Sequence, residues 1–271
     1  MISVLILTRN EQQDLPACLD SVSFSDDVHV FDSTSTDNTC NIARARGAHV
    51  TQRPFDSYAK QRNAALRNLP FKHEWLFILD ADERPTPELA AEMQLAATTA
   101  PANIAGFRLQ RRDFLWGTWL KHAQITPLYI RLVRHKQARY EREINEVITV
   151  DGNIADLHNY LDHFPFSKGI AHWVAKHNVY STMEAALIAS GTTQADASLS
   201  TALFAKDFHQ KRAAQKALFF KLPARPLLKW LYMMFFRGAI LDGAAGLAYA
   251  TLQSFYEYLI VLKTRELRTK K

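Results

Sequence analysis

Four short apolar runs, separated by longer mixed stretches, dominate the first third of this chain. The runs cover residues 2–7, 28–31, 48–52 and 75–79. Each has the length and apolar content of a buried β-strand. After the first run, Leu15, Leu19 and Val22 recur at helical spacing, and residues 57–69 predict a further helix. Strands that alternate with helices predict an α/β fold with a mostly parallel central sheet and right-handed crossovers.

The pattern changes after a helix that begins near Pro87. Further apolar runs lie at residues 105–110, 128–133 and 144–150. No long helix separates these runs, so they predict a mixed or antiparallel extension of the sheet. A long helix is predicted from Ser167 to Ser190, and the small polar residues 191–200 after it predict a loop.

Composition narrows the class of protein. The chain has 271 residues, of which 48% are hydrophobic and 22% charged, as in globular proteins. Its two cysteines, Cys18 and Cys40, offer neither a zinc spacing nor a disulfide framework, which fits a reducing cytosol. The start, MISVLILTRNEQQ, lacks a basic region before its apolar run, so it predicts a strand and not a signal peptide.

The net charge of +6 belongs to the C-terminal part of the chain. Residues 204–271 carry 13 Lys and Arg against 4 Asp and Glu, whereas residues 1–203 carry 20 against 23. Bulky apolar residues lie beside these basic ones, as in a helix that rests on anionic lipid. We therefore expect monotopic attachment to the cytoplasmic face of the inner membrane, at its surface. The alternative is that these helices pack on the rest of the protein or on another subunit; no nucleic-acid motif appears.

Two apolar stretches of this C-terminal part, residues 227–236 and 240–262, are interrupted by charges. The interrupting residues are Lys229, Arg237, Asp242 and Glu257. A transmembrane helix needs about 20 predominantly apolar residues, so neither stretch predicts a clean span.

The sequence WLFILDADER, from Trp75 to Arg84, carries the first candidate chemistry. Asp80 and Asp82 follow a buried strand, at the end where open α/β sheets bind ligands. Carboxylates completed by substrate phosphates are a common setting for Mg²⁺ or Mn²⁺. The alternative interpretation is that these acids cap the helix that Pro85 and Pro87 begin.

Polar residues follow the other strands as well. Thr8, Asn10 and Glu11 follow the first strand, and Asp32 ends the second. Neither Gly-x-Gly-x-x-Gly nor a Walker lysine loop is present among only nine glycines. A nucleotide diphosphate would therefore be neutralised by metal and side chains, and three polar clusters at one sheet edge predict a ligand site there.

In order and spacing, four segments resemble the family-2 glycosyltransferases of the GT-A fold. They are SVLILTRNEQQDLPACLDSV, VFDSTSTDNT, YAKQRNAAL and WLFILDADERPTPEL. The resemblance is closest to bacterial transferases of the lipopolysaccharide inner core, including the β-1,4-glucosyltransferase type, and of exopolysaccharide clusters. RLVR, INEVITVDG, LDHF and the C-terminal segment FFRGAILDGAAGLAYATLQSFYEYLIVLK extend it over nearly the whole chain.

The resemblance implies the following organisation. A GT-A (Rossmann-like) catalytic domain would cover residues 1–190, with its nucleotide-sugar half at about 1–100 and its acceptor half at about 101–190. Residues 191–271 would form the basic, amphipathic, membrane-associating tail. The implied activity is inverting transfer of a hexose, glucose or similar, from a UDP-sugar to a lipid-linked saccharide, with Mg²⁺ or Mn²⁺ as cofactor.

The resemblance also implies roles for individual residues of the donor site. Thr8, Asn10 and Glu11 would line the nucleotide pocket, and Asp32 would contact the base. Arg62 would lie against the diphosphate, and Asp80 near the ribose and the metal. Asp82 would be the main metal ligand, and some GT-A enzymes add a late histidine, for which His163 is the candidate.

A carboxylate must take the proton of the acceptor hydroxyl in such a reaction. Glu146 occupies the position of the glutamate in a His-Glu pair of the family, but Asn145 replaces the histidine. Asp113 is the second candidate. For Glu141 and Glu143 we favour a solvated strand with arginine partners over a catalytic role.

Two other functions compete with the transferase. Strand-Asp-x-Asp also occurs in haloacid-dehalogenase-like phosphatases and phosphotransferases, where Asp80 would be the nucleophile, but there the aspartates follow the N-terminal strand. The other alternative is a membrane adaptor that keeps the fold without catalysis.

Overall fold

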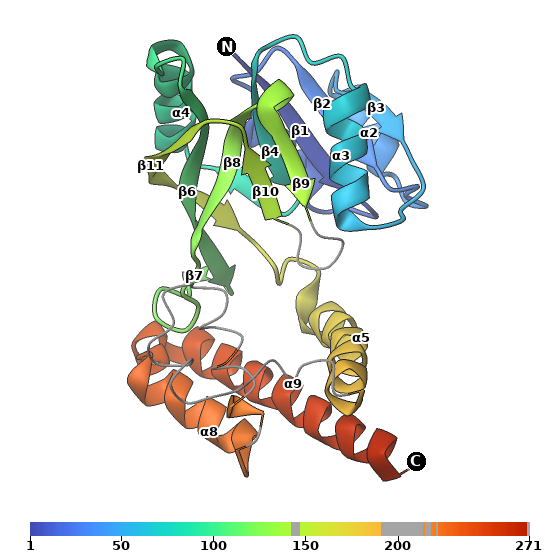
Figure 1. The fold of residues 1–271 in the computed structure, drawn as a ribbon, viewed down its shortest axis with the longest axis vertical. Helices are drawn as coiled ribbons and strands as arrows, with labels where there is room; N and C mark the ends of the chain where they lie inside the picture. The colour runs from blue at the N-terminus through green and yellow to red at the C-terminus, as the bar shows by residue number, and fades with distance from the viewer. Residues whose placement is uncertain (142–146, 191–213, 215–217, 221, 270–271) are drawn as a thin grey trace. The chain divides into compact units, whose positions relative to one another are not determined.

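The structure is a computed structural model that describes residues 1–141, 147–190, 214, 218–220 and 222–269 (Figure 1). By its internal contacts the chain forms two compact units. The first unit consists of Met1–Phe114 and Thr126–Ser167, and the second of Leu115–Ile125 and Lys168–Lys271.

The first unit is built on one large sheet whose strands follow the order β3-β2-β1-β4-β8-β6-β11-β5. These strands are β1 (Ile2–Thr8), β2 (Val28–Asp32), β3 (His49–Gln52), β4 (Trp75–Asp80), β5 (Glu83–Pro85), β6 (Ile104–Leu115), β8 (Leu128–Arg134) and β11 (Asn153–His163). The strands β1 to β4 are all parallel, whereas β8 is antiparallel to β4 and to β6. The predicted parallel sheet with a mixed extension is therefore confirmed.

Helices cover both faces of the parallel part. They are α1 (Leu15–Ser21), α2 (Thr39–Ala45), α3 (Tyr58–Asn68) and α4 (Pro87–Thr99). Alternate residues of β4 point to opposite faces, so Trp75, Phe77 and Leu79 join one core and Leu76 and Ile78 the other. Residues of α1, α2 and α4 fill the first core, and residues of α3 the second. This burial on both faces explains why β4 is apolar throughout.

A small antiparallel ribbon of β9 (Ala138–Glu141) and β10 (Val147–Val150) packs beside α3 on the second core. It follows the short helix η1 (His135–Gln137). The structure contains more strand than the sequence predicts, because β5, β9, β11 and the short β7 (Thr118–Trp119) are additional and β6 continues five residues beyond the predicted end at residue 110. The part of the predicted strand from residue 144 to 146 lies outside the described residues.

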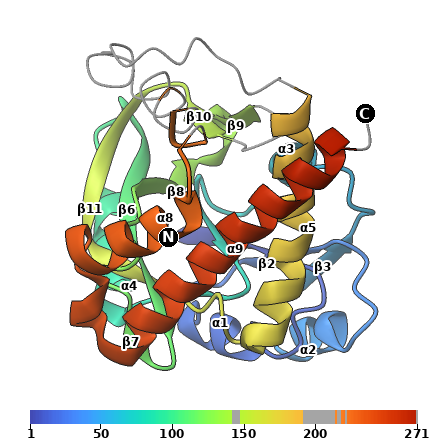
Figure 2. The same cartoon turned by 90° about the horizontal axis from the view of Figure 1, so that it is seen from below.

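The second unit is helical. It contains α5 (Gly169–Ala189), α8 (Arg225–Leu231), the π-helical segment η2 (Tyr232–Phe236), η3 (Ala239–Asp242) and α9 (Gly243–Thr269), together with β7 (Thr118–Trp119). The helices α5 and α9 lie side by side (Figure 2). Lys263 of α9 binds α5 through the carbonyl oxygen of Asn178, at 2.6 Å, and the hydroxyl of Ser181, at 2.7 Å.

The predicted domain boundary near residue 190 differs from the boundary between the two compact units, which lies after Ser167. The family resemblance implies that α5 belongs to the catalytic domain, whereas by contacts α5 packs with α9 in the second unit. The functional division into catalytic domain and tail remains a prediction.

Candidate active site

The carboxyl ends of β1, β2 and β4 bring the polar residues that follow them to one edge of the sheet. In the parallel register Thr8 lies opposite Asp32, and Leu7 lies opposite Asp80. The expectation that these groups share an edge is therefore confirmed. This edge is where open α/β sheets bind their ligands.

Asp32 is buried and well supplied with hydrogen bonds. Its carboxylate accepts from the hydroxyl of Thr8 at 2.9 Å, the backbone N–H of Ser35 at 2.7 Å and the side-chain amide of Gln52 at 3.1 Å. Burial alone would raise the pKa of Asp32, but these hydrogen bonds outweigh it and lower the pKa. Asp32 therefore stays ionised at neutral pH and holds the ends of three strands together.

Asn10 and Glu11 lie in the loop after β1 and bind the loop after β2. Asn10 has a left-handed backbone, with φ of 56°, and its side-chain oxygen accepts from the N–H of Thr36 at 2.8 Å. The N–H of Glu11 donates to the hydroxyl of Thr39 at 2.8 Å. These hydrogen bonds fix the segments that follow β1 and β2 to each other, and the two segments form a wall of the site beside Thr8 and Asp32.

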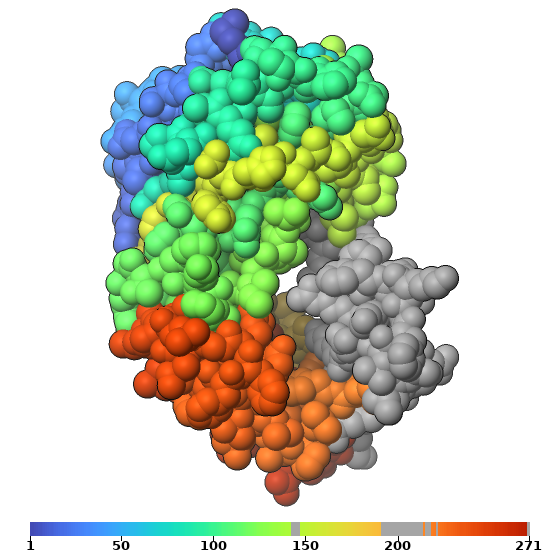
Figure 3. Space-filling view, turned by 90° about the vertical axis from the view of Figure 1, so that its left-hand side faces the viewer, coloured from blue at the N-terminus to red at the C-terminus, as the bar shows by residue number. Residues whose placement is uncertain are grey.

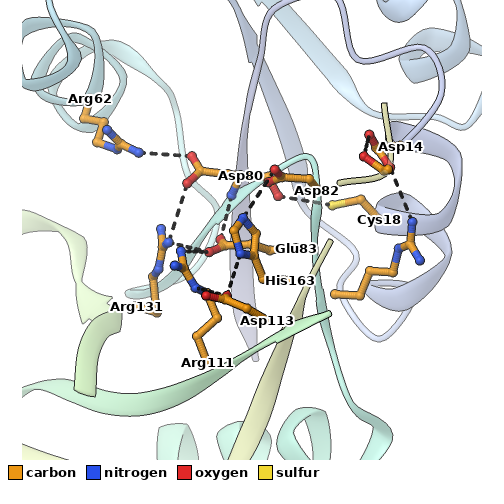
Figure 4. Close-up of polar contacts among 12 residues, drawn as sticks. Asp14, Cys18, Arg62, Asp80, Asp82, Glu83, Arg111, Asp113, Arg131 and His163 are labelled. Atoms are coloured by element: carbon orange, nitrogen blue, oxygen red, sulfur yellow. Dashed lines mark hydrogen bonds and ion pairs between the residues drawn. The ribbon is translucent and has the colours of Figure 1, made fainter. Parts of the chain in front are cut away.

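Asp80 lies between two arginines (Figure 4). The guanidinium of Arg62, from α3, is 3.0 Å from one carboxylate oxygen, and that of Arg131, from β8, is 3.5 Å from the other. Burial raises the pKa of Asp80, but the two arginines lower it by more, so its pKa is lowered overall. Arg62 also lies over the ring of Tyr140, 5.5 Å from its centroid.

Glu83, the first residue of β5, joins Asp80 to the arginines of the sheet. Its side chain is fully buried, with Arg131 at 2.6 Å and Arg111 of β6 at 3.5 Å. Its second oxygen accepts the backbone N–H of Asp80 at 2.9 Å. Burial raises the pKa of Glu83, and Asp80 raises it further, against the opposite effect of Arg131. Glu83 therefore fixes the backbone that carries Asp80.

His163 joins Asp82 to Asp113 (Figure 4). The pairing of β11 with β6 places His163 opposite Asp113, and its pairing with β5 places it opposite Glu83. One ring nitrogen of His163 is 2.7 Å from Asp113 and the other is 3.3 Å from Asp82. Burial lowers the pKa of this imidazole, but its two carboxylate partners raise it to about 9.

Asp113 is held from two sides. Besides His163, its carboxylate has the guanidinium of Arg111 at 2.9 Å. Burial raises the pKa of Asp113, but the hydrogen bond from His163 and the charge of Arg111 lower it overall. Its role as the catalytic base remains a prediction. The other candidate, Glu146, lies outside the described residues, as does Glu143, whereas Glu141 forms an exposed ion pair with Arg139 at 3.2 Å.

Asp80 and Asp82 do not cap the helix that follows them. The helix α4 begins at Pro87, and its N-cap is Thr86, whose hydroxyl accepts from the N–H of Leu89 at 3.2 Å. The helix-cap interpretation of Asp-x-Asp-Glu is therefore wrong. Asp80 and Asp82 therefore belong to the site at the strand ends.

The donor groups at this edge decide whether a divalent metal fits. Among the described residues, no group of three or more His, Cys, Asp or Glu side chains is arranged to hold a metal ion. Asp82 and His163 nevertheless face each other, and Mg²⁺ needs only one or two protein carboxylates when substrate phosphates complete its shell. The donor set fits a metal that enters together with a diphosphate.

Two arginines of this site, Arg131 and Arg111, are absent from the site residues that the sequence predicts. Arg131 is only 8% exposed and contacts two carboxylates. The position of Arg131 between the apolar residues Ile130 and Leu132 is a signal, because a charge within a buried strand needs an opposite charge beside it. Arg111 carries no such signal, because its neighbours Gln110 and Arg112 are polar.

This sheet and its edge define an α/β fold of the GT-A type. The sheet is mostly parallel and Rossmann-like with a mixed extension, and its acids lie at the ends of its parallel strands. The chain belongs to glycosyl transferase family 2, whose family model, described as "Glycosyl transferase family 2", matches residues 3–161. This membership excludes the haloacid-dehalogenase-like alternative.

Similar proteins extend over most of the chain. The lipopolysaccharide core biosynthesis glycosyltransferase LpsC of Rhizobium meliloti (strain 1021) is 25% identical over 272 residues, which cover 97% of this chain and 91% of that protein. An uncharacterized glycosyltransferase of Rickettsia typhi is 26% identical over 99% of this chain and 88% of its own length. The protein is thus similar to bacterial glycosyltransferases along its full length.

A solved structure of lower similarity is that of glucosyl-3-phosphoglycerate synthase from Mycobacterium tuberculosis in complex with Mn²⁺, UDP and glucosyl-3-phosphoglycerate. It is 23% identical, with a TM-score of 0.36, and the match covers 41% of this chain and 44% of that chain.

Proposed function

We propose that this protein is a metal-dependent inverting transferase that moves a hexose from a UDP-sugar to a lipid-linked saccharide of lipopolysaccharide core or exopolysaccharide synthesis. The observation that carries the proposal is the placement of Asp80 and Asp82 at the sheet edge, with arginines on both sides. Membership of family 2 supports the reaction class. The printed name of the Rhizobium relative supports the lipopolysaccharide core as the setting.

The residues at the edge suit a nucleoside diphosphate. Thr8, Asn10, Glu11 and Asp32 form the wall that would receive the nucleoside. Arg62 and Arg131 are cations that can exchange part of their contact with Asp80 for phosphate oxygens, since guanidinium groups bind carboxylate and phosphate in the same geometry. Asp82 would be the main protein ligand of Mg²⁺ or Mn²⁺, with Asp80 near it and substrate phosphates completing the shell.

When bound, the metal would supply positive charge that stabilises the departing diphosphate. The protein's own groups would do the rest. The acceptor oxygen forms a bond to the anomeric carbon while the bond from that carbon to the diphosphate oxygen breaks, with inversion. A carboxylate, Glu146 or Asp113, takes the proton of the acceptor hydroxyl, so no covalent sugar–enzyme intermediate forms.

The donor site can be tested by thermal-shift titration of the full chain with UDP, GDP and CMP, each with and without Mn²⁺. A ligand that binds only the native state stabilises it by about 2.7 kcal/mol at a hundredfold excess over its dissociation constant. We expect UDP to raise the melting temperature, and to raise it further when Mn²⁺ is added. In Asp82→Asn the Mn²⁺-dependent part should disappear.

The matched control is Asp162→Asn. Asp162 neighbours His163 on β11 but pairs with Arg112 at 2.6 Å, outside the site. This variant should keep the Mn²⁺-dependent shift. A Mn²⁺-dependent rise in melting temperature in Asp82→Asn equal to that of wild type contradicts the proposed metal ligand. A rise with GDP or CMP, and none with UDP, contradicts the proposed donor.

A further inference from the structure

A run of large apolar side chains is exposed on the second unit, on α8, η2 and η3. Phe236 is 86% exposed, Leu241 71% and Phe235 62%. The other exposed apolar residues of this run are Leu227, Leu228, Leu231, Tyr232 and Ile240. We call these eight residues the apolar face; their segment is orange in Figure 3, where its atoms lie at the surface. So dense a set of exposed apolar side chains marks an interaction surface.

The charges that interrupt this apolar sequence point inward and are paired. Glu257 and Arg225 are both buried, with 2.8 Å between Glu257 Oε1 and Arg225 Nε. Lys229 lies 3.8 Å from the other oxygen of Glu257 and donates to Gln253 at 3.3 Å. These contacts lie between α8 and α9, so they leave the outer side of α8 apolar.

The remaining two charges bind the segment of residues 115–125. Buried Asp242 accepts the backbone N–H groups of His122, at 2.9 Å, and Ala123, at 2.7 Å, and it contacts the His122 ring at 2.7 Å. Arg237 donates to the carbonyl oxygen of Ala123 at 3.4 Å. All four charges that break the apolar pattern in sequence are thus removed from the apolar face in the structure.

The bend that carries the apolar face is built into the backbone. Gly238 and Gly243, on either side of η3, have φ of 76° and 62°, a region that favours glycine. Gly246 of α9 lies so close to η3 that an added Cβ would be 1.9 Å from the carbonyl oxygen of Ala239. The backbone conformation of the bend therefore keeps Phe235, Phe236 and Leu241 exposed.

Length and apolar content point to a lipid surface as the partner. Within the described residues, no single helix is long and apolar enough to cross a membrane. Arg225–Phe236 and Ala239–Thr269 together have the length and apolar content of a span, but the pair is bent by 72°. An element with an apolar outer side, inward charges and aromatic residues at its bend suits insertion in the plane of a bilayer interface. The excess of basic residues from 204 to 271 favours anionic lipid.

We propose that the apolar face inserts into the surface of an anionic bilayer, with Phe235, Phe236 and Leu241 as its deepest residues. Such insertion attaches the protein to one side of the membrane, where a lipid-linked acceptor is accessible. The proposal stands on the second unit alone and does not rest on the proposed donor.

The first test places an environment-sensitive fluorophore on the face. Both native cysteines are buried, so labelling of the full-length Phe236→Cys variant with an NBD dye is selective. Vesicles of phosphatidylglycerol and phosphatidylethanolamine should shift the NBD emission to shorter wavelength. Leu95→Cys, at a 63% exposed position on α4 of the first unit, should show no shift. Absence of a shift at position 236, or equal shifts at both positions, overturns the proposal.

The second test measures vesicle flotation of the unlabelled full-length protein. Phe235→Ser with Phe236→Ser should lower the partition coefficient at least about tenfold, since burial of one phenylalanine is worth about that factor or more. Leu95→Ser should leave it unchanged. The proposal is overturned if the double variant floats with vesicles as well as the wild type does. It is also overturned if the wild type binds no vesicles but dimerises with increasing concentration, and the double variant does not dimerise.

Melting temperature and the UDP shift serve as controls in both tests. They should be the same in wild type and in the serine variants, because the apolar face contributes little to the core. If the UDP shift fails in every variant while flotation behaves as expected, the donor proposal fails and the membrane proposal stands.

Discussion

At the scale of single residues, the site is a chain of alternating charges. Its members in order of contact are Arg62, Asp80, Arg131, Glu83, Arg111, Asp113, His163 and Asp82. Each buried charge has an opposite charge beside it, which offsets the cost of removing it from water. Glu83 occupies the middle of this chain and is its most deeply buried acid.

Glu83→Gln should therefore be strongly destabilising. The variant keeps the size of the side chain but removes the nearest opposite charge of Arg131, which then has only Asp80 at 3.5 Å, and breaking a buried pair costs about 3–5 kcal/mol. Urea unfolding measures the loss. Glu141→Gln is the control, because Glu141 forms an exposed pair with Arg139 and such pairs are worth less than about 1 kcal/mol. Equal losses in the two variants would contradict the account of Glu83.

Part of this site follows from sequence and part does not. Asp80 and Asp82 follow an apolar strand and Asp32 ends another, so their common edge is predictable from the parallel order of the strands. The partners of these acids are not, because Arg131 and Arg111 come from antiparallel strands whose register depends on the whole sheet. For the same reason the contact of His163 with both Asp82 and Asp113 requires the pairing of β11 on two sides.

At the scale of elements, Asp27 links three parts of the first unit. It accepts from the hydroxyl of Ser3 in β1 at 2.5 Å, the backbone N–H of Lys72 before β4 at 2.8 Å, and the ring of His29 in β2 at 2.9 Å. Burial raises the pKa of Asp27, but these partners outweigh it and lower the pKa. The buried carboxylate thus fixes the amino-terminal ends of neighbouring strands.

The depressed pKa predicts a pH dependence of stability. When the folded pKa of a carboxylate lies below its unfolded value of about 3.9, its contribution is complete above that value and is lost as pH falls through the folded pKa. The free energy of unfolding of Asp27→Asn should be at least about 1 kcal/mol below wild type at pH 7, because hydrogen bonds to charged groups contribute that much. The two should converge toward pH 3.

Urea denaturation between pH 3 and pH 7 checks this expectation. Asp20→Asn, which removes an exposed pair with Arg46, should give a curve that follows wild type. A constant difference between wild type and Asp27→Asn over the whole range would contradict the role assigned to the Asp27 carboxylate.

At the scale of the whole molecule, the chain passes between its two units three times. Residues 115–125 leave the first unit, join the second and return, and the chain leaves again after Ser167. Asp242 fixes this inserted segment within the second unit through His122 and Ala123. The second unit therefore owes part of its structure to a segment that is distant in sequence.

Asp242→Asn should loosen the second unit and leave the first intact. The amide side chain cannot accept from both backbone N–H groups and the ring of His122 as the carboxylate does, so we expect a loss of about 2 kcal/mol. Hydrogen exchange followed by mass spectrometry should show faster exchange in residues 115–125 and 239–250, with the sheet unchanged. Asp156→Asn, at an exposed pair with Arg108, is the control. Uniformly faster exchange in both units would contradict separate cooperative units.

The sequence by itself determined the α/β class, the parallel order of the first four strands, the strand-end acids and the family. These follow from local apolar periodicity and from motifs that lie within short segments. Only the tertiary structure decided the partners of those acids and the direction of the charges that interrupt residues 227–262. Lys229, Arg237, Asp242 and Glu257 break an apolar pattern in sequence, yet they point inward, because α9, α8 and the segment of residues 115–125 give them partners. Which side of a helix is buried depends on its neighbours, and those come from distant parts of the chain.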